Sequence, residues 1–381
     1  MALVRIGRFG RLVHTLKEQE IILDTPLIGG KRRLPEKEPE STDSKQNRSA
    51  RSIARKALPA LEKSEVLSSL SDLQLASVKP GTVKLYVGLW TEMMTFAKKR
   101  RAAINENTVD LLLKTWMSDS YMEGFQSGRG SQMIAAVKCF FPVFARGGQR
   151  KLTQAAQALR GWRAKAPGLT RLPLPWEVVA LIAHSMIKQG HTWMGFLVIL
   201  QHHCYLRPAE IFRVKGGMLI APVPGTSHAN WNLVLHPHEA GQPSKTKEFD
   251  EVVTIDLKMY KELLDHGLEV LKAVRGPQQP LFEFTQKAFA KQFRLTCIEC
   301  GLGGLKPHTY HLRHSGPSHD KSRNLRTLLG IKIRGRWRSD SSLRRYQKEG
   351  RVSQQLSALP AETRARAVAA PRLLKSALSK L

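Results

Sequence analysis

The hydrophobic pattern of this chain changes across a proline-rich segment at residues 166–175. Before that segment, apolar residues recur at helical spacing and no alternating strand pattern appears. After it, helical stretches are interrupted by three short runs rich in strand-forming residues. Each proline also favours extended backbone at the residue before it, so we interpret the segment as a joint. The pattern therefore predicts a helical domain followed by an α+β domain.

The first predicted domain covers residues 73–168 and consists of four helices with many basic side chains on their outer faces. Its best-defined helix carries one apolar stripe at helical spacing, and Gly81 and Thr82 are expected to cap it. The stripe consists of Val83, Tyr86, Trp90, Met93 and Ala97. Three more helices are expected at residues 108–117, 131–141 and 153–162.

The second predicted domain covers residues 172–352 and combines helices with a small antiparallel sheet. The expected strands are residues 218–221, 231–235 and 252–255. The expected helices are residues 176–188, 192–203, 257–274 and 285–297, with others around Arg313, Leu325 and Ser341. The predicted fold class is therefore α+β and mainly helical.

The two ends of the chain differ from these domains. Residues 1–72 are predicted to be a disordered basic segment, because the part from about residue 29 to residue 63 is polar, charged and nearly free of aromatic residues. The basic run Lys31, Arg32 and Arg33 could serve nuclear import. No secretory signal is expected, since arginines interrupt the apolar residues at the N-terminus. Residues 353–381 are expected to form a C-terminal tail that contacts a neighbouring subunit.

Charge is the first pointer to a partner. Lys and Arg number 61 against 31 Asp and Glu, which is a formal net charge of +30. A compact protein with such a surplus repels itself, so the excess normally faces a polyanion. DNA or RNA is the first expectation, an anionic membrane surface the second, and a ribosomal or merely basic soluble protein the alternative. The longest apolar stretch, residues 193–200, is far shorter than the roughly 18 residues of a membrane span and predicts a buried helix.

The four cysteines are scattered at Cys139, Cys204, Cys297 and Cys300. The last two form a single CxxC pair, and no second Cys or His pair follows at zinc-finger spacing. We therefore expect reduced thiols, no metal site and no cofactor.

Two segments of the second domain carry side chains suited to a phosphate site. Arg207 can hold a phosphate by two parallel hydrogen bonds, and Glu210, one turn later, could fix the Arg207 side chain. Arg and Glu at this spacing are also a common helix pair without any function. Lys245 and Lys247 lie in an expected hairpin at residues 241–247, where a lysine is usually solvated surface.

Three later segments complete the set of candidates. The cluster entering a helix at residues 308–314 contains His308, Tyr310, His311, Arg313 and His314. Its alternative interpretation is a satisfied core or surface cluster. The remaining segments are Gly335-Arg-Trp337 and residues 342–346, which end in Tyr346.

The order of these segments resembles the tyrosine recombinase, or phage integrase, family. That family has an Arg with a Glu three residues later, a hairpin Lys beside a Thr, a His-x-x-Arg pair, and a His or Trp nine residues before a nucleophilic Tyr. Here the corresponding residues are Arg207, Lys245, Arg313, Trp337 and Tyr346, and Trp337 stands nine residues before Tyr346. The resemblance covers about residues 175–350. The preceding helical domain resembles the core-binding domain of the family.

The resemblance implies a site-specific DNA strand transferase. Tyr346 would attack the scissile phosphate and form a 3′-phosphotyrosyl link, leaving a free 5′-hydroxyl. Arg207 and Arg313 would neutralise the phosphate oxygens, Lys245 would protonate the departing 5′-oxygen, and Trp337 would donate its indole N–H. The bond energy stays in the phosphotyrosine, so resealing would need neither ATP nor metal.

The same resemblance implies double-stranded DNA as the partner and a homo-oligomer on it, a tetramer during synapsis, with the two domains gripping the duplex. The amino-acid sequences at residues 313–318 and at Gly335-Arg-Trp337 look most like those of recombinases of eukaryotic mobile elements. The nucleus is therefore the expected location. A bacterial source would place the protein in the cytoplasm with the nucleoid.

One position departs from the family pattern. Tyr310 stands three residues before Arg313, where the family usually has His, and this makes the assisting base uncertain. His308 and His311 flank it. Three alternatives remain open: a type IB topoisomerase, which shares the chemistry, a catalytically inactive DNA-binding relic of a mobile element, and a general basic protein that coats nucleic acid.

The charge surplus leads to a test of the partner. If the protein contacts about 6–10 phosphates, its affinity for duplex DNA should fall about 10³–10⁵-fold between about 50 and 200 mM salt, because lysines and arginines release counterions on binding. A salt titration followed by fluorescence anisotropy measures this slope. A nearly flat salt dependence would mean that the basic surplus serves another partner.

Chelators should leave cleavage unchanged.

Overall fold

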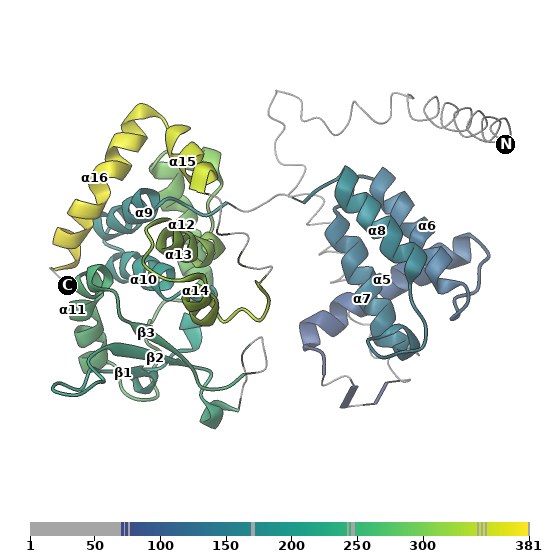
Figure 1. Cartoon of the computed structure of the whole chain (residues 1–381), viewed down its shortest axis with the longest axis horizontal. Helices are drawn as coiled ribbons and strands as arrows, with labels where there is room; N and C mark the ends of the chain where they lie inside the picture. The colour runs from purple at the N-terminus through teal and green to yellow at the C-terminus, as the bar shows by residue number, and fades with distance from the viewer. Residues whose placement is uncertain are drawn as a thin grey trace, which may run out of the picture. The chain divides into compact units, whose positions relative to one another are not determined.

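The computed structural model describes residues 70–71, 73–74, 77–168, 172–241, 244, 248–340, 343, 346 and 349–379 (Figure 1). The chain divides into two compact units, Met1–Leu169 and Thr170–Leu381. The division falls inside the segment that the sequence predicts to be a joint. Within the described residues, no helix combines the length and the apolar character needed to cross a membrane.

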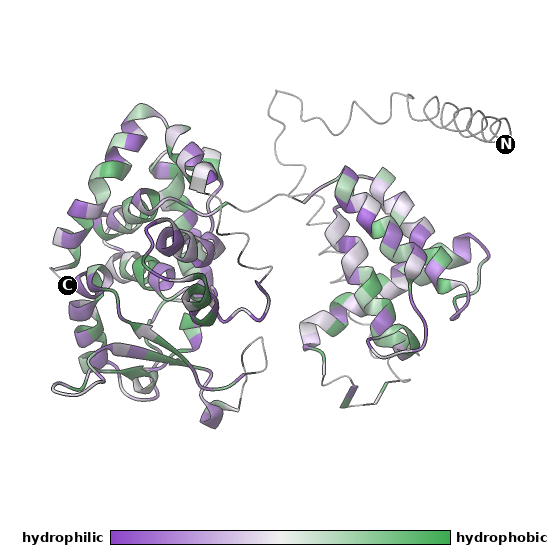
Figure 2. Cartoon of the chain, in the orientation of Figure 1, coloured by the Kyte–Doolittle hydropathy of each residue, from purple (hydrophilic) through white to green (hydrophobic). Residues whose placement is uncertain are grey.

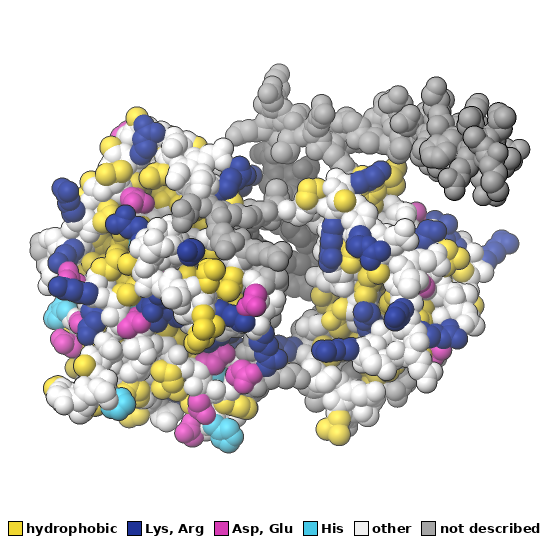
Figure 3. All heavy atoms as spheres, in the orientation of Figure 1, with side chains coloured by type: hydrophobic (Ala, Val, Ile, Leu, Met, Phe, Trp, Pro, Cys, Tyr) yellow, Lys and Arg dark blue, Asp and Glu magenta, His cyan; other side chains and the backbone are white. Residues whose placement is uncertain are grey.

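The first unit contains the four predicted helices. They are α5 (Pro80–Lys99), α6 (Val109–Met122), α7 (Ser127–Phe140) and α8 (Thr153–Lys165). Helix α5 packs on α7, and α6 packs on α8. Large apolar side chains fill the space between them, among them Trp90, Met93, Trp116, Met133 and Trp162. Lys and Arg outnumber acidic side chains over the face of this unit that Figure 3 shows.

Two helix starts in this unit differ from the sequence prediction. Helix α5 begins at Pro80 with Lys79 at its N-cap, so Gly81 and Thr82 lie inside the helix and do not cap it. Proline is suited to the first helical position because its missing N–H would have no partner there. Helix α7 begins at Ser127, earlier than expected, and contains Gly130. A Cβ atom at Gly130 would lie 3.0 Å from the Trp162 ring, so the glycine allows close approach to α8.

The second unit is mainly helical with a small sheet, as predicted. Its first helices, α9 (Trp176–Lys188) and α10 (Thr192–His203), have the bounds expected from the sequence. Every residue of α10 from Gly195 to His203 is buried, and up to Leu200 the helix is apolar on all sides, which is typical of a core helix (Figure 2). The later helices are α11 (Lys258–Val274), α12 (Gln286–Glu299), α13 (Tyr310–Ser322), α14 (Leu328–Gly335), α15 (Glu349–Ser357) and α16 (Ala361–Leu378).

The sheet is antiparallel and has the order β1-β2-β3. Its strands are β1 (Leu219–Ile220), β2 (Trp231–Leu235) and β3 (Glu251–Ile255). The register places Leu219 opposite Leu233 and Leu233 opposite Val253. All three side chains are buried, so one row across the sheet faces the helical core. The lysines of the expected hairpin, Lys245 and Lys247, belong to the connection between β2 and β3 and lie outside the described residues.

The C-terminal segment differs from the expected tail. Residues 353–381 contain most of α15 and all of α16, and α16 packs along α9 (Figure 1). Small and apolar side chains of α16 belong to the core of the second unit: Ala367, Ala370, Leu374 and Leu378. Alanines and a proline inside the helix, Pro371, concealed this buried face in the sequence. A helix was also expected around Ser341, but Ser341 lies outside the described residues, so this prediction is not tested.

The buried face of α16 can be tested by a matched pair of leucines. Leu374 is fully buried, whereas its neighbour Leu373 is 48% exposed. Leu374→Ala should lower the free energy of unfolding by about 2–5 kcal/mol, because the change leaves a cavity in the core. Leu373→Ala should change it by less than about 0.5 kcal/mol. Urea unfolding followed by circular dichroism measures both, and equal effects would contradict the packing of α16 on α9.

Candidate active site

The site begins where the chain leaves helix α10. Tyr205 follows that helix with a φ of 50°, a conformation uncommon for residues other than glycine. Its side chain is fully buried, and its hydroxyl donates a hydrogen bond to Asp320. Its carbonyl oxygen accepts a hydrogen bond from Arg313 Nη1. These contacts hold Tyr205 in a backbone conformation that turns the next residues toward the site.

Arg207 and Glu210 make the contact expected from their spacing. The backbone N–H of Arg207 donates to Glu210 Oε2 over 2.7 Å, and the Arg207 guanidinium bonds the other carboxylate oxygen. The Glu210 side chain is 5% exposed and that of Arg207 is 16% exposed. Glu210 therefore holds the guanidinium of Arg207 in place while leaving part of it accessible.

A third arginine, which we did not single out in the sequence, joins this cluster. Arg336 is the middle residue of the Gly-Arg-Trp segment and takes a φ of 54° at the end of α14. Its Nη2 donates to Glu210 Oε2 over 2.6 Å, and its Nε lies 3.2 Å from Glu251 Oε2. Glu251 is the first residue of β3 and also lies 4.0 Å from Arg207 Nη1. Two carboxylates therefore sit between two guanidiniums.

The arginines change the protonation behaviour of Glu210. Burial, the largest single influence, would raise the pKa of its carboxyl group, but Arg336 and Arg207 outweigh burial and lower it. Glu210 is therefore charged at neutral pH. Its contribution to stability is present above the ordinary pKa of glutamate and is lost as the pH falls through the lowered value.

Arg313 lies on α13 and is 2% exposed. Besides the carbonyl of Tyr205, it bonds the carbonyl oxygen of Gly335 through Nη2 over 2.6 Å. Both partners are backbone groups, and no carboxylate of the described residues forms an ion pair with it. Burial, followed by the charges of Arg336 and Arg207, lowers the pKa of Arg313 to about 10. The guanidinium remains charged at neutral pH and is available to an anion.

Two glycines allow these elements to approach each other. A Cβ atom at Gly335 would lie 1.8 Å from the ring of Trp337, so the indole covers the glycine backbone. A Cβ atom at Gly316 would lie 2.1 Å from the carbonyl oxygen of His202 and 2.7 Å from the ring of Tyr205. Helix α13 can therefore lie directly against the end of α10, which brings Arg313 within reach of the Tyr205 carbonyl.

Tyr346 packs at the same place, although it is far away in the sequence from α10 and α13. Its ring centroid lies 4.9 Å from that of Trp337, and the Arg313 guanidinium carbon lies 5.1 Å from the Trp337 ring centroid. The Tyr346 hydroxyl lies 3.1 Å from His314 Nδ1, and the residue is 2% exposed. Trp337 therefore lies between the predicted nucleophile and an uncompensated cation.

The other members of the 308–314 cluster have different positions. The backbone N–H of His308 donates to His311 Nδ1 over 3.0 Å, and the two rings lie 4.0 Å apart. His311 therefore supports the start of α13. The ring of Tyr310 contacts His314 edge-on, with the centroids 5.0 Å apart.

The two hairpin lysines, Lys245 and Lys247, lie outside the described residues. The base of their turn is described: the Ser244 N–H donates to the Glu248 carbonyl oxygen over 2.8 Å. Asp250 N–H donates to the carbonyl oxygen of His236 over 3.0 Å. These bonds join the described ends of the β2–β3 connection next to Glu251, the strand residue that contacts the arginine cluster.

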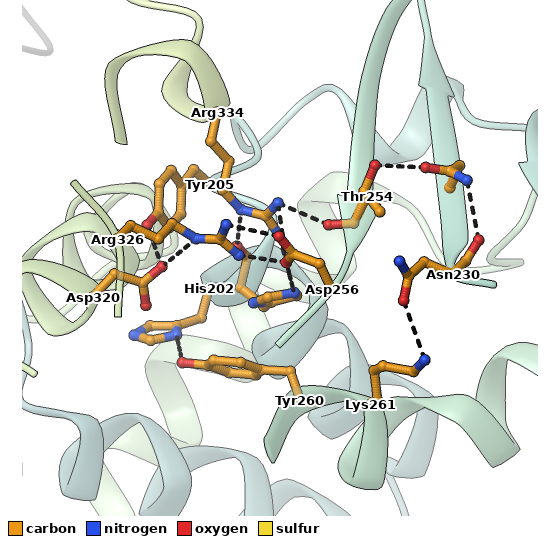
Figure 4. A network of polar contacts seen from close by, with 12 residues as sticks. His202, Tyr205, Asn230, Thr254, Asp256, Tyr260, Lys261, Asp320, Arg326 and Arg334 are labelled. Carbon is orange, nitrogen blue, oxygen red and sulfur yellow. Dashed lines mark hydrogen bonds and ion pairs between the residues drawn. The ribbon is translucent and has the colours of Figure 1, made fainter. Parts of the chain in front are cut away.

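A second polar network lies behind the site (Figure 4). Asp320 accepts hydrogen bonds from Tyr205 and from Arg326 Nε, the latter over 2.9 Å. Arg326 also bonds Asp256, at the end of β3. Arg334 donates to the carbonyl oxygens of Thr254 and His203, over 2.7 and 3.0 Å. The network therefore connects the end of α10 with α13, α14 and the sheet.

One group of side chains has the spacing of a metal site. Glu210, His236 and Glu251 each place a ligand atom within 4.8 Å of the others. Both carboxylates already face guanidinium groups, which would repel a divalent cation. All four cysteines are free thiols, and Cys297 and Cys300 are buried in the core.

The importance of Glu210 can be tested against an exposed ion pair. Glu210→Gln removes the shared partner of Arg207 and Arg336 and should lower the free energy of unfolding by about 3–5 kcal/mol, because buried charges lose their compensation. Glu248 pairs with Arg338 at the surface, where the side chains are 56% and 70% exposed. Glu248→Gln should cost less than about 1 kcal/mol. Similar losses in urea unfolding would contradict a buried charge cluster.

The chain was compared with protein-family models, with curated protein sequences and with solved structures. No family model matches the chain, and no curated protein sequence matches it. A structure of XerH site-specific recombinase bound to a palindromic difH substrate is 16% identical with a TM-score of 0.49, covering 73% of this chain and 79% of that one. A lambda integrase dimer bound to a COC′ core site is 12% identical with a TM-score of 0.47, covering 82% of each chain.

A third solved structure, that of XerA recombinase, is 15% identical with a TM-score of 0.34 and covers 76% of this chain and 95% of that one. These are proteins to which the chain is similar. With TM-scores below 0.5, the likeness by itself carries no conclusion about activity. The function must be inferred from the site.

Proposed function

We propose that this protein is a tyrosine recombinase, a DNA strand transferase that cuts and rejoins duplex DNA through a 3′-phosphotyrosyl intermediate. The observation that carries this proposal is the convergence of Arg207, Arg313, Trp337 and Tyr346. The Tyr346 ring packs on Trp337, and Trp337 packs against the Arg313 guanidinium. A phenol beside a guanidinium that bonds only backbone carbonyls, that of Arg313, is suited to attack on a phosphodiester.

The chemistry follows from these side chains. Tyr346 attacks phosphorus, and negative charge builds on the non-bridging oxygens of the pentacoordinate state. Arg313 and Arg207 stabilise that charge, because both guanidiniums are held in fixed positions before the substrate arrives. Trp337 contributes an indole N–H, which is a donor only. Lys245, from the connection between β2 and β3, protonates the 5′-oxygen as it leaves.

The reaction conserves the energy of the broken bond. One phosphodiester is exchanged for a phosphotyrosyl ester, so a 5′-hydroxyl can reverse the reaction without ATP. The three arginines and Lys245 supply the positive charge that a metal ion would otherwise supply. Duplex DNA is the proposed partner, and strand exchange between two duplexes requires several copies of the chain acting together.

The nucleophile is tested with DNA that traps the covalent product. The probe is a pool of nicked duplexes whose sequence is randomised over several helical turns, so that no target need be known beforehand. Protein–DNA adducts are isolated under denaturing conditions, and the captured DNA is amplified and sequenced. The recovered sequence then provides a defined substrate.

Tyr346→Phe should bind this substrate as tightly as the parent protein and form no adduct, because only the attacking oxygen is removed. Gel electrophoresis under denaturing conditions measures the adduct, and anisotropy measures binding. An adduct that persists in Tyr346→Phe and disappears in Tyr310→Phe would move the nucleophile to Tyr310. No adduct from the parent protein on any member of the pool would favour a catalytically inactive DNA-binding protein.

A further inference from the structure

The proposed reaction needs a proton acceptor, and the residue expected to assist is a tyrosine in this chain. A tyrosine hydroxyl that attacks phosphorus must give up its proton as the new bond forms. Tyr310 occupies the position of the usual histidine. A phenol lacks the basic ring nitrogen with which an imidazole accepts a proton.

One side chain is placed to accept it. His314 Nδ1 lies 3.1 Å from the Tyr346 hydroxyl oxygen, within the reach required of a general base. Trp337, whose ring packs on that of Tyr346, offers only a donor. The contact between His314 Nδ1 and the Tyr346 hydroxyl is buried, so this nitrogen is placed to take the proton.

The other histidines of the cluster have different partners. His311 Nδ1 accepts the N–H of His308 at the start of α13. His319, further along the same helix, packs against Trp176 and His202. Burial, followed by the charge of Arg323, lowers the pKa of His319 to about 4. Of these histidines on α13, His314 is the one that contacts the predicted nucleophile.

Tyr310 has a role in this arrangement. It precedes His314 by one helical turn, a spacing at which side chains on a helix touch. Its ring meets the imidazole edge-on at 66°, with the centroids 5.0 Å apart, and His314 is 9% exposed. The imidazole is therefore confined between the ring of Tyr310 and that of Tyr346, with Nδ1 directed at the hydroxyl.

We propose that His314 is the catalytic proton acceptor for Tyr346, and that Tyr310 is a positioning residue that holds the His314 ring. This inference rests on the proposed function. The Tyr346 oxygen bonds to phosphorus as its proton passes to Nδ1, while the bond from phosphorus to the 5′-oxygen breaks and that oxygen takes a proton from Lys245. Rejoining reverses each step, and the tyrosine oxygen recovers its proton from His314. This step requires the His314 tautomer in which the ring proton is on Nε2 and Nδ1 is free of a proton.

The first test compares two histidines of α13, the buried His314 and the half-buried His319, on the DNA recovered from the randomised pool. His314→Asn keeps a polar atom near the Nδ1 position but cannot accept a proton. It should slow single-turnover adduct formation by about 10²–10⁴-fold with DNA binding unchanged. His319→Asn, on the same helix and outside the site, should form the adduct at the parent rate. An unchanged rate in His314→Asn would overturn the inference.

A second measurement separates proton removal from packing. Tyrosine with fluorine on its ring, incorporated at position 346, has a more acidic phenol that ionises without help. With this nucleophile, the rate loss caused by His314→Asn should shrink by at least about tenfold, since less of the barrier depends on a base. A loss of the same size with both nucleophiles would mean that His314 only positions Tyr346, and would overturn the proposal.

A third arm uses DNA with sulfur in place of the bridging 5′-oxygen. The thiolate leaves without a proton, so Lys245→Ala should recover on this substrate while His314→Asn stays slow. Recovery of His314→Asn would make it the acid for the leaving group and overturn its assignment as base. Thermal unfolding checks that His314→Asn is folded. If it is not folded, two variants of Tyr310 are compared in its place. Tyr310→Ala removes the ring that holds His314 and should slow adduct formation. Tyr310→Phe keeps the ring and should form the adduct at the parent rate.

These outcomes are separate from failure of the proposed function. An adduct formed by Tyr346→Phe would overturn both the nucleophile and its base. A parent protein that requires Tyr346 but tolerates His314→Asn with either nucleophile would keep the proposed function and remove only this inference.

Discussion

The guanidinium of Arg313 is the contact on which the arrangement of the site depends. It bonds the carbonyl oxygen of Tyr205, which follows α10, and that of Gly335, which ends α14, while Arg313 itself belongs to α13. Three elements far apart in sequence thus meet at one side chain. Because both acceptors are uncharged backbone carbonyls, they hold the positive charge of Arg313 in a fixed position but do not neutralise it. Substituting Lys would retain a charge but could not span both carbonyls in a fixed plane.

The sequence predicted the elements that have strong local signals. The bounds of α9 and α10 and the three strands followed from hydrophobic pattern, and the Arg207–Glu210 pair followed from its spacing. Helix α16 was missed because its buried face mixes two leucines with Thr363, Ala367 and Ala370, small side chains that give a weak hydrophobic pattern. Which face of α16 is buried depends on the surface of α9 against which it packs. No local property of residues 361–378 indicates that surface.

The site residues that were missed share another property. Arg336 and Tyr205 act through backbone conformations with positive φ and through contacts with distant segments. A tyrosine with a φ of 50° has no local sequence signal, since the conformation is held by Asp320 and Arg313. His314 was noted as one histidine among three, and only its distance to the Tyr346 hydroxyl distinguishes it from His308 and His311.

Charge is distributed unequally between the site and the network behind it. In the network, Arg326 and Arg334 face Asp256 and Asp320, so the charges balance. In the site, Glu210 and Glu251 face three guanidiniums, those of Arg207, Arg313 and Arg336. The balanced layer can be buried at modest cost, because each ion there has a partner. Counted over its described residues alone, the site keeps one positive charge in excess, which matches the single negative charge of a phosphodiester. As attack adds a second negative charge, the attraction increases, so the same excess that admits the substrate stabilises the transition state more strongly.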